Sequence, residues 1–172
     1  AGLILAEEEA MGGCAGRNRD LRPDATRHGH FRDRDALMAD VARRARAFGM
    51  RIGAYDPNVL PGDSIWTEQG VTHLDMVPLL SQSDVVSIHA ALTPGTRRMI
   101  GAQALSLMKK DALLINTARG GIVDEQALAD ALDHDRLAGA GFDVLTEEPP
   151  VHGNVLLQAK NIIITPHSAW ST

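Results

Sequence analysis

The sequence has little of what a secreted or membrane protein needs. It contains a single cysteine, Cys14, so no disulfide can form within the chain, and a reducing compartment is the default expectation. No apolar run reaches the roughly 20 residues that span a bilayer. Residues 1–9 are a short apolar stretch that runs into three glutamates and lacks the basic start of a signal peptide. We therefore expect a cytoplasmic protein that does not bind membranes.

Basic residues are also outnumbered by acidic ones. The chain has 17 Lys and Arg against 22 Asp and Glu, a formal net charge of −5, and no basic block, so nucleic acid is not an expected partner. What the sequence does have is a hydrophobic content of 44% over 172 residues. That is enough for one domain with a real core and too little for two comfortable ones. There are no internal repeats.

The main pattern is a series of short apolar runs that each end in a polar or charged residue. The runs end at Asp56, His89, Asn116, Asp143 and His167. Helical patterns lie between them, and strands that alternate with helices predict an α/β fold with a doubly wound, Rossmann-like parallel sheet in a single domain. Parallel strands would bring the five residues to one edge, where open α/β sheets bind ligands. The alternative is coincidence, because surface loops are polar in any fold.

The segment around Arg119 shows this pattern most clearly. The run Leu113–Ile115 has the length of a strand that is buried on both faces. Gly120 and Gly121 then permit a sharp turn where a side chain would clash. Asp124 is predicted to cap the helix that follows. Arg119 is thereby placed in a loop beyond the carboxyl end of a strand.

Helical periodicity predicts further helices over residues 36–48, 75–80 and 103–108. In the first of them four apolar residues share one face: Leu37, Val41, Ala45 and Phe48. Before it the pattern dissolves, because residues 12–34 hold many charged residues and almost no apolar ones. We therefore expect an irregular segment over residues 1–38, with a short helix fragment at its start, and a folded domain over residues 39–172.

Four long motifs carry a resemblance to a known family. They are Ser87–Pro94 (SIHAALTP), Leu114–Glu125 (LINTARGGIVDE), Gly139–Pro150 (GAGFDVLTEEPP) and Ile164–Trp170 (ITPHSAW). Together they resemble the NAD-binding domain of the D-isomer-specific 2-hydroxyacid dehydrogenases, and the last motif is most similar to the glycerate dehydrogenase (hydroxypyruvate reductase) branch. The resemblance implies a Rossmann-like, NAD(P)-binding domain over residues 39–172. It also implies hydride transfer between NAD and a D-2-hydroxy acid or the matching 2-oxo acid, with NADP the less favoured cofactor.

The resemblance implies roles for three catalytic residues. Arg119 matches the arginine that grips the substrate carboxylate, a task that suits its planar, bidentate guanidinium. His167 matches the histidine that exchanges a proton with the substrate hydroxyl. Glu148 matches the acid that pairs with this histidine and orients it, and the adjacent Glu147 is the alternative. Without the family, Arg119 reads as a surface arginine and His167 as a capping or structural histidine.

Contacts to the cofactor are implied in the same way. Asp143 matches the residue that binds the nicotinamide carboxamide, and Asp56 the carboxylate that bonds the adenosine ribose hydroxyls. No arginine follows Asp56, which favours NAD over NADP, although a plain turn aspartate before a proline is its alternative reading. The remaining histidines show no paired spacing, so no metal site is expected. Further cofactor contacts are expected from His89, Thr93, Pro94, Thr117 and Ala118.

Two departures from the family pattern bear on these expectations. The family places a Gly-x-Gly-x-x-Gly turn before its first helix, and residues 31–38 (FRDRDALM) contain no glycine. We therefore expect the first strand and its turn to be degraded; a shifted reading frame over residues 21–37 is one explanation, which the codons of the gene would test. Relatives also carry a substrate domain, whereas these residues match the nucleotide domain alone. We expect the isolated chain to be inactive or nearly so.

Two other functions stay open from the sequence. One is a non-catalytic Rossmann-like remnant that has lost cofactor binding, and the other is a nucleotide-binding regulatory module. The remnant predicts that NADH does not bind saturably, and the regulatory module predicts binding without turnover. A homodimer is a further expectation, because relatives pair through the nucleotide domain.

Overall fold

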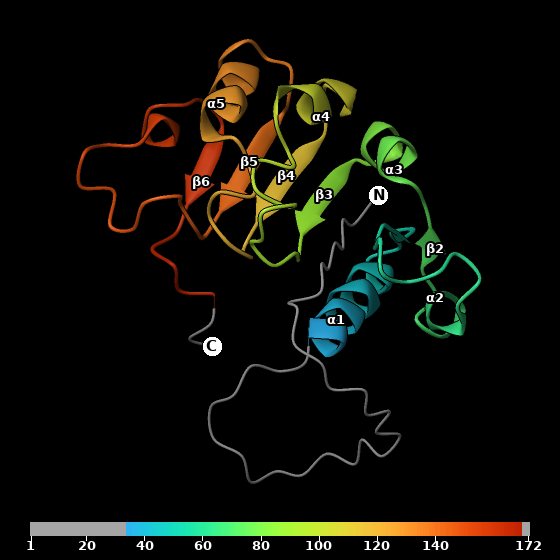
Figure 1. Cartoon of the computed structure of the whole chain (residues 1–172). Helices are drawn as coiled ribbons and strands as arrows, with labels where there is room; N and C mark the ends of the chain where they lie inside the picture. Colours follow the sequence, from blue (N-terminus) through green and yellow to red (C-terminus); the bar gives the residue numbers. More distant parts are fainter. Residues whose placement is uncertain (1–33, 170–172) are drawn as a thin grey trace, which may run out of the picture.

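The computed structural model of the chain describes residues 34–169. The helix fragment predicted at the start of the sequence, most of the irregular segment and the expected first strand lie outside these residues. The described part is an α/β fold in which helices and strands alternate along the chain (Figure 1). Every strand pair in it is parallel. The predicted fold class is therefore confirmed.

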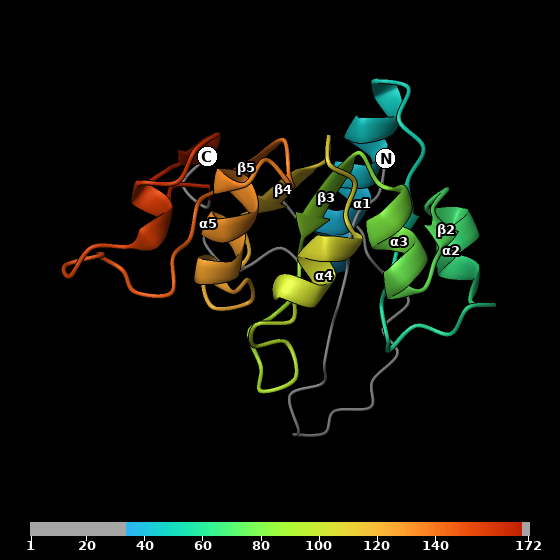
Figure 2. The ribbon, with the colours of Figure 1, turned by 90° about the horizontal axis from the view of Figure 1, so that it is seen from above.

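The larger sheet contains four of the five strands that the apolar runs predicted. They are β3 (Val85–Ile88), β4 (Leu113–Asn116), β5 (Gly139–Phe142) and β6 (Ile162–Ile164), and they lie in this order. The helices α3 (Met76–Gln82), α4 (Ala102–Leu107) and α5 (Glu125–Asp133) cover one face of this sheet, as Figures 1 and 2 show. A short 3-10 helix, η1 (Val155–Leu157), precedes β6.

The register of this sheet fixes one edge for the predicted site. Ile88, Asn116, Phe142 and Ile164 form a single row across the four strands. Because the strands are parallel, the chain leaves all four at the same edge. The loops that follow this row carry most of the residues that the sequence singled out.

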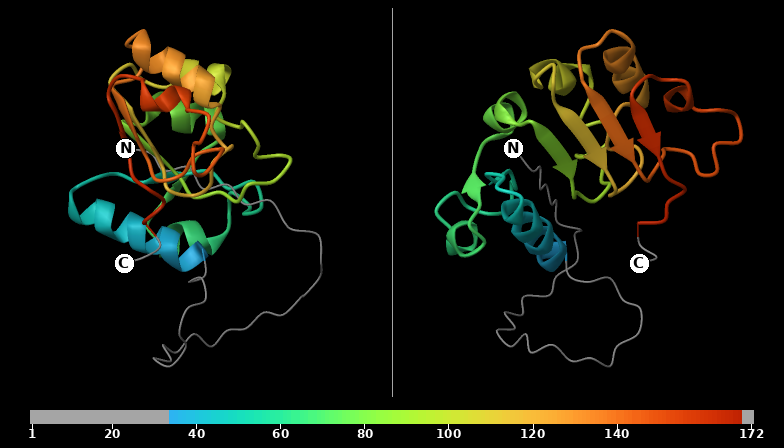
Figure 3. Two further views of the ribbon diagram at one scale, coloured as in Figure 1. Left: turned by 90° about the vertical axis from the view of Figure 1, so that its left-hand side faces the viewer. Right: turned by 180° about the vertical axis from the view of Figure 1, so that it is seen from behind.

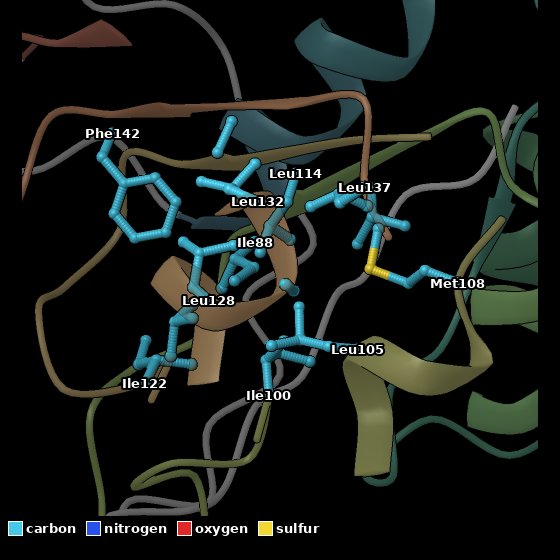
Figure 4. Close-up of a cluster of buried hydrophobic side chains, with 14 of the residues drawn as sticks. Ile88, Ile100, Leu105, Met108, Leu114, Ile122, Leu128, Leu132, Leu137 and Phe142 are labelled. Carbon is cyan, nitrogen blue, oxygen red and sulfur yellow. The ribbon is translucent and has the colours of Figure 1, made fainter. Parts of the chain in front are cut away.

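The main core lies between this sheet and its three helices. Its buried side chains come from strands, helices and loops alike, and Figure 4 shows ten of them labelled. Four of them are completely buried: Leu114 of β4, Leu128 and Leu132 of α5, and Ile100 of the loop between β3 and α4. Complete burial of a leucine or isoleucine side chain stabilises the fold by roughly 1.5–3 kcal/mol, so this layer anchors the loops of the larger sheet.

A smaller layer precedes the larger sheet in sequence. It contains α1 (Arg34–Ala47), β1 (Gly53–Ala54), α2 (Ser64–Glu68) and β2 (Thr72–His73), and β1 pairs with β2 alone. Its own core is small: Ala42, Ile52, Ala54, Trp66 and Val71. Neither α2 nor β2 was predicted. Figure 3 shows this layer beside β3 and α3.

The gap between the two sheets lies at the position that the first strand occupies in a doubly wound fold. In the order 3-2-1-4-5-6 that strand lies between the second and the fourth, which here correspond to β1 and β3. Within residues 34–169 no ladder joins β1 to β3. The residues expected to supply the strand precede residue 34 and lie outside the description.

The ends of α1 correct two predictions. The helix begins at Arg34, so the last five of the eight residues where the glycine-rich turn was sought are helical. Phe48 was expected on the apolar face, yet it is 86% exposed, because the helix ends at Ala47 and Gly49 turns the chain at a φ of +77°. The helices predicted over 75–80 and 103–108 correspond to α3 and α4, whose observed ends differ from the predicted ends by one or two residues. None of the described helices is long and apolar enough to cross a membrane.

Candidate active site

Asn116 fixes the loop that carries Arg119. Its fully buried side chain accepts a hydrogen bond from the Ala118 N–H (3.1 Å) and donates from Nδ2 to the Arg119 carbonyl (3.0 Å). Asparagine side chains commonly close turns in this way. The Arg119 side chain itself is exposed, and its Nη1 donates to the Ala118 carbonyl at 2.6 Å. Thr117 and Ala118, predicted cofactor contacts, lie on the same loop.

The loop after β3 is tied to the Arg119 loop by backbone bonds. The Arg98 N–H donates to the Gly121 carbonyl (2.8 Å), and the Ile100 N–H donates to the Ile122 carbonyl (3.2 Å). The glycine adopts a φ of +79°, which a residue with a side chain rarely does, so the predicted need for glycine there is confirmed. The two loops therefore form one connected rim.

Two threonines shape the loop that carries Thr93 and Pro94. Thr96 is only 5% exposed; its hydroxyl donates to the Ala91 carbonyl (2.5 Å) and accepts from the Thr93 N–H (2.8 Å). The Thr93 hydroxyl accepts in return from the Thr96 N–H at 3.2 Å. Thr93 is half-buried and Pro94 is exposed. The reciprocal bonds hold the loop in one shape, a role for Thr96 that the sequence analysis missed.

His167 and Glu148 meet across 19 residues of sequence. His167 Nδ1 donates to Glu148 Oε2 at 2.5 Å, and the other carboxylate oxygen accepts the Leu145 N–H at 2.6 Å. The histidine side chain is 41% exposed and that of the glutamate 32%, so the pair lies at the surface of the rim. With Nδ1 engaged, Nε2 is the ring nitrogen that can exchange a proton with a ligand. Of the two adjacent glutamates considered, Glu148 makes this contact.

Asp143 holds the segment that presents His167. One oxygen of its buried carboxylate accepts from the Thr165 hydroxyl and from the Ser168 N–H (2.9 Å), and the other accepts from the Ala169 N–H (2.8 Å). His167 lies between these contacts with a φ of +52°, a left-handed conformation that few residues other than glycine adopt. The carboxylate therefore stabilises an unusual turn.

The same contacts govern the ionisation of Asp143. Burial raises the pKa of this carboxyl, but the hydrogen bonds from Thr165, Ala169 and Ser168 and the charge of His167 together outweigh it and hold the pKa below its ordinary value. Asp143 is accordingly a carboxylate at neutral pH. Three of its roughly four acceptor positions are occupied.

His89 is a neutral histidine at the end of β3. Its Nε2 lies 2.9 Å from the Ser87 hydroxyl oxygen, and burial lowers the pKa of its ring to about 4. At neutral pH the ring therefore carries no charge and offers a donor and an acceptor. That suits a neutral ligand group better than proton exchange near pH 7. The Ser87 partner was not predicted, although it stands two positions earlier on the same face of the strand.

Asp56 lies just beyond the smaller sheet. It follows β1, is 5% exposed, and its Oδ1 accepts the Asn58 N–H at 2.9 Å. The neighbouring Tyr55 packs against the main core, which places the end of β1 next to the larger layer. The prediction of one shared edge thus holds directly for the residues at the ends of β3 to β6, whereas Asp56 follows a strand that belongs to a separate sheet.

The Arg119 loop and the Glu148 loop touch at Gly120. A Cβ atom on this glycine would lie 1.8 Å from the Leu145 carbonyl oxygen and 2.7 Å from the Thr146 nitrogen. Only a residue without a side chain permits this approach. Arg119 and the Glu148–His167 pair are therefore carried by loops in direct contact. Within residues 34–169 no group of three or more His, Cys, Asp or Glu side chains is arranged to hold a metal ion.

A parallel sheet with such polar loops at its carboxyl edge is the architecture of doubly wound α/β domains, which bind ligands at that edge. Residues 37–169 match the family described as D-isomer specific 2-hydroxyacid dehydrogenase, NAD binding domain. The chain therefore belongs to the D-isomer-specific 2-hydroxyacid dehydrogenase family and contains its NAD-binding domain.

Individual relatives agree with this assignment. The chain is 48% identical to the glycerate dehydrogenase of Methylorubrum extorquens, over 80% of this chain and 41% of that protein. It is 47% identical to the (S)-sulfolactate dehydrogenase of Chromohalobacter salexigens, over 79% and 44%. Among solved structures, the NAD-complexed D-isomer specific 2-hydroxyacid dehydrogenase of Lactobacillus delbrueckii ssp. bulgaricus superposes with a TM-score of 0.69 and 38% identity, over 78% of this chain and 43% of that one. The chain thus spans about two fifths of the length of these relatives.

Proposed function

We propose that this chain is the part of a D-2-hydroxyacid dehydrogenase that binds NAD and carries the proton-exchanging histidine, with a glycerate- or hydroxypyruvate-like substrate. The observation that carries the proposal is the His167–Glu148 pair, at 2.5 Å, on the same rim as the Arg119 loop. The substrate class is inferred from the glycerate dehydrogenase relative and from the matching motifs. Asp143 supports the pair by holding the turn after β6.

Arg119 binds the substrate carboxylate in this proposal. The guanidinium is exposed at the rim, and its loop is held by Asn116 and packed against the Glu148 loop at Gly120. A guanidinium offers two parallel N–H donors to a carboxylate, which fixes the orientation of the acid as well as its position.

His167 exchanges the proton. In the oxidation direction Nε2 accepts the hydroxyl proton as the C2 hydrogen leaves as a hydride, and in the reverse direction Nε2 returns the proton to the carbonyl oxygen. Glu148 accepts the Nδ1–H, so it orients the ring and leaves Nε2 to exchange the proton. When bound, NAD supplies the acceptor of that hydride.

The described residues fit the two ends of the cofactor. Asp56 is a buried carboxylate at the end of β1 with no basic residue directly after it, which suits ribose hydroxyls and disfavours a 2′-phosphate. At the other end, Asp143 has one acceptor position left for an amide donor, and the neutral His89 follows β3 at the same edge of the sheet. The residues expected to form the pyrophosphate turn lie mostly before residue 34, outside the described part.

The test is NADH-dependent reduction of hydroxypyruvate and glyoxylate, with NADH binding measured in parallel. Arg119→Lys should lower kcat/KM by about 10- to 100-fold, because a charged bidentate bond is lost, while NADH affinity stays unchanged. Arg136→Lys, an exposed arginine near the amino-terminal end of β5, is the matched control. An Arg119 variant with undiminished kcat/KM would refute the assignment.

We propose further that the isolated 172-residue chain turns over slowly or not at all, since the residues it shares with its relatives make up only 41% and 44% of those proteins. NADH binding without turnover supports this proposal, and turnover at the rate of a complete enzyme refutes it. If neither binding nor turnover is found, the chain is a non-catalytic remnant instead.

We also propose that two copies of the chain pair. The face of the larger sheet opposite α3 to α5 presents apolar side chains, with Leu113 41% and Ile163 73% exposed. A parallel sheet is normally covered on both faces, and exposed apolar patches commonly mark interfaces. Sedimentation velocity should show a dimer; a monomer at all concentrations would contradict the pairing.

A further inference from the structure

Glu125 extends from α5 to the loop that carries Glu148. Its Oε1 accepts the Thr146 N–H at 2.7 Å, and its Oε2 accepts from Asn154 Nδ2 at 2.8 Å. The helix does not need this carboxylate for its cap, because Asp124 already accepts the N–H of the third residue along at 3.2 Å. Both oxygens of Glu125 therefore bind a segment that lies 21 and 29 residues further along the chain.

The bonds of Glu125 are close to those that orient Glu148. Thr146 directly follows Leu145, whose N–H donates to Glu148 Oε1 at 2.6 Å. The backbone of the same two residues also packs against Gly120. The peptide group between Leu145 and Thr146, which directly follows the N–H that binds Glu148, is thus fixed by a charged hydrogen bond and by a backbone contact.

We propose that Glu125 is a positioning residue for the His167–Glu148 pair. It holds Thr146 through Oε1 and Asn154 through Oε2, which sets the place of Leu145 N–H and hence the direction of the Glu148 carboxylate toward Nδ1 of the histidine. The consequence for turnover rests on the proposed dehydrogenase function, whereas the effect on the pair does not.

The first experiment observes the pair without any turnover. In the full chain labelled with ¹⁵N-histidine, the Nδ1–H of His167 should give a low-field proton signal, assigned by its absence from His167→Gln. Glu125→Ala should abolish or shift this signal. Gln126→Ala is the matched control, because this side chain is on the same helical turn but bonds to Asp130 of its own helix at 3.0 Å. An unchanged signal in Glu125→Ala overturns the proposal.

A pair of substitutions that exchanges the carboxylate and the amide between positions 125 and 154 distinguishes loss of this contact from simple misfolding. Asn154→Asp keeps the oxygen that accepts the Leu156 N–H at 2.9 Å, but it places a second carboxylate against Glu125, so the signal should be lost. Adding Glu125→Gln restores one donor and one acceptor between the two positions, and the signal should return. Failure of the double variant to restore the signal, while it melts like the wild type, also overturns the proposal.

The second experiment connects the pair to turnover in any preparation of the protein that reduces hydroxypyruvate. Glu125→Ala should lower kcat by about 10- to 100-fold, since small misplacements of a reacting group cost up to about 100-fold, with little change in KM. If the signal is lost but kcat is unchanged, Glu125 positions the pair as proposed and the assignment of that pair to catalysis fails. The two proposals are therefore tested separately.

Discussion

Replacing Gly120 with alanine tests whether the Arg119 loop and the Glu148 loop are packed as the structure has them. The added Cβ would lie 1.8 Å from the Leu145 carbonyl oxygen and 2.2 Å from the carbonyl carbon. To reach an ordinary contact distance of 3.4 Å, the two loops must separate by about 1.6 Å. Both sides of the contact are backbone, so no side chain can rotate away to relieve it.

The cost of this separation follows from overpacking. Inserting a methyl group into a well-packed site destabilises a protein by typically 1–3 kcal/mol, and we expect the upper end, about 3 kcal/mol. For a chain of this length each kcal/mol lowers the melting temperature by about 2–4 °C, so Gly120→Ala should melt about 6–12 °C below the wild type. The low-field signal of His167 should be lost as well, because Leu145 N–H orients Glu148.

Two other glycines serve as controls in the same thermal-unfolding assay. Gly62→Ala meets nothing within 4 Å, and its φ is ordinary, so its stability should change by less than about 0.5 kcal/mol. Gly49→Ala also meets nothing, but its φ of +77° should cost about 1 kcal/mol. If Gly120→Ala has the same melting temperature as Gly62→Ala, the two loops are not in contact and the account of the rim is wrong.

Further predictions concern ionisation and cofactor choice. Burial lowers the pKa of His89 to about 4 in the folded chain. The unfolded chain therefore takes up a proton on this ring near pH 6.5, whereas the folded chain takes it up only near pH 4. Stability should fall by about 3 kcal/mol as the pH drops from 6.5 to 4, and in denaturant titrations this slope should be absent from His89→Gln. The pKa of Asp143 is held low, so its stabilising contribution is present above the unfolded pKa and disappears as the pH falls through the folded value; in Asp143→Asn this acid-side loss should be missing. Asp56→Ala should weaken NADH binding and reduce the ratio of the affinity for NADH to the affinity for NADPH. If this ratio is unchanged, Asp56 does not contact the ribose.

Much of the larger sheet could be predicted because its signals are local. Each strand is an apolar run bounded by a polar residue, and Asp124 stands directly before the helix that it caps, as its bond to Ala127 N–H confirms. Gly120 and Gly121 were expected at a sharp turn, and one has a positive φ while the other lies against the backbone of another loop.

The smaller layer was predicted less well because its elements are short. The strand β2 has two residues and α2 has five, too few for a periodic pattern. The one buried residue of α2 is Trp66, whose Nε1 donates to the Leu60 carbonyl at 2.9 Å. The start of α1 was predicted two residues too late, because charged residues occupy its first two positions in the sequence.

Within the site, contacts between distant residues were the least predictable. The sequence indicated Asp143 and His167 separately, but the bonds that Asp143 makes to residues 22 to 26 positions away depend on the tertiary fold. The contacts of Glu125 have the same origin. Such bonds leave no spacing signal, because the intervening loop can have any length.

The most direct test of the central claim is a titration of the folded chain with NADH, followed by its fluorescence. If the carboxyl edge of the sheet is a nicotinamide dinucleotide site, binding saturates, and NADH binds at least about tenfold more tightly than NADPH, a difference of about 1.4 kcal/mol. If a chain with native thermal unfolding shows no saturable binding of either nucleotide, this polypeptide is not a functional cofactor domain, and the account given for its site is wrong.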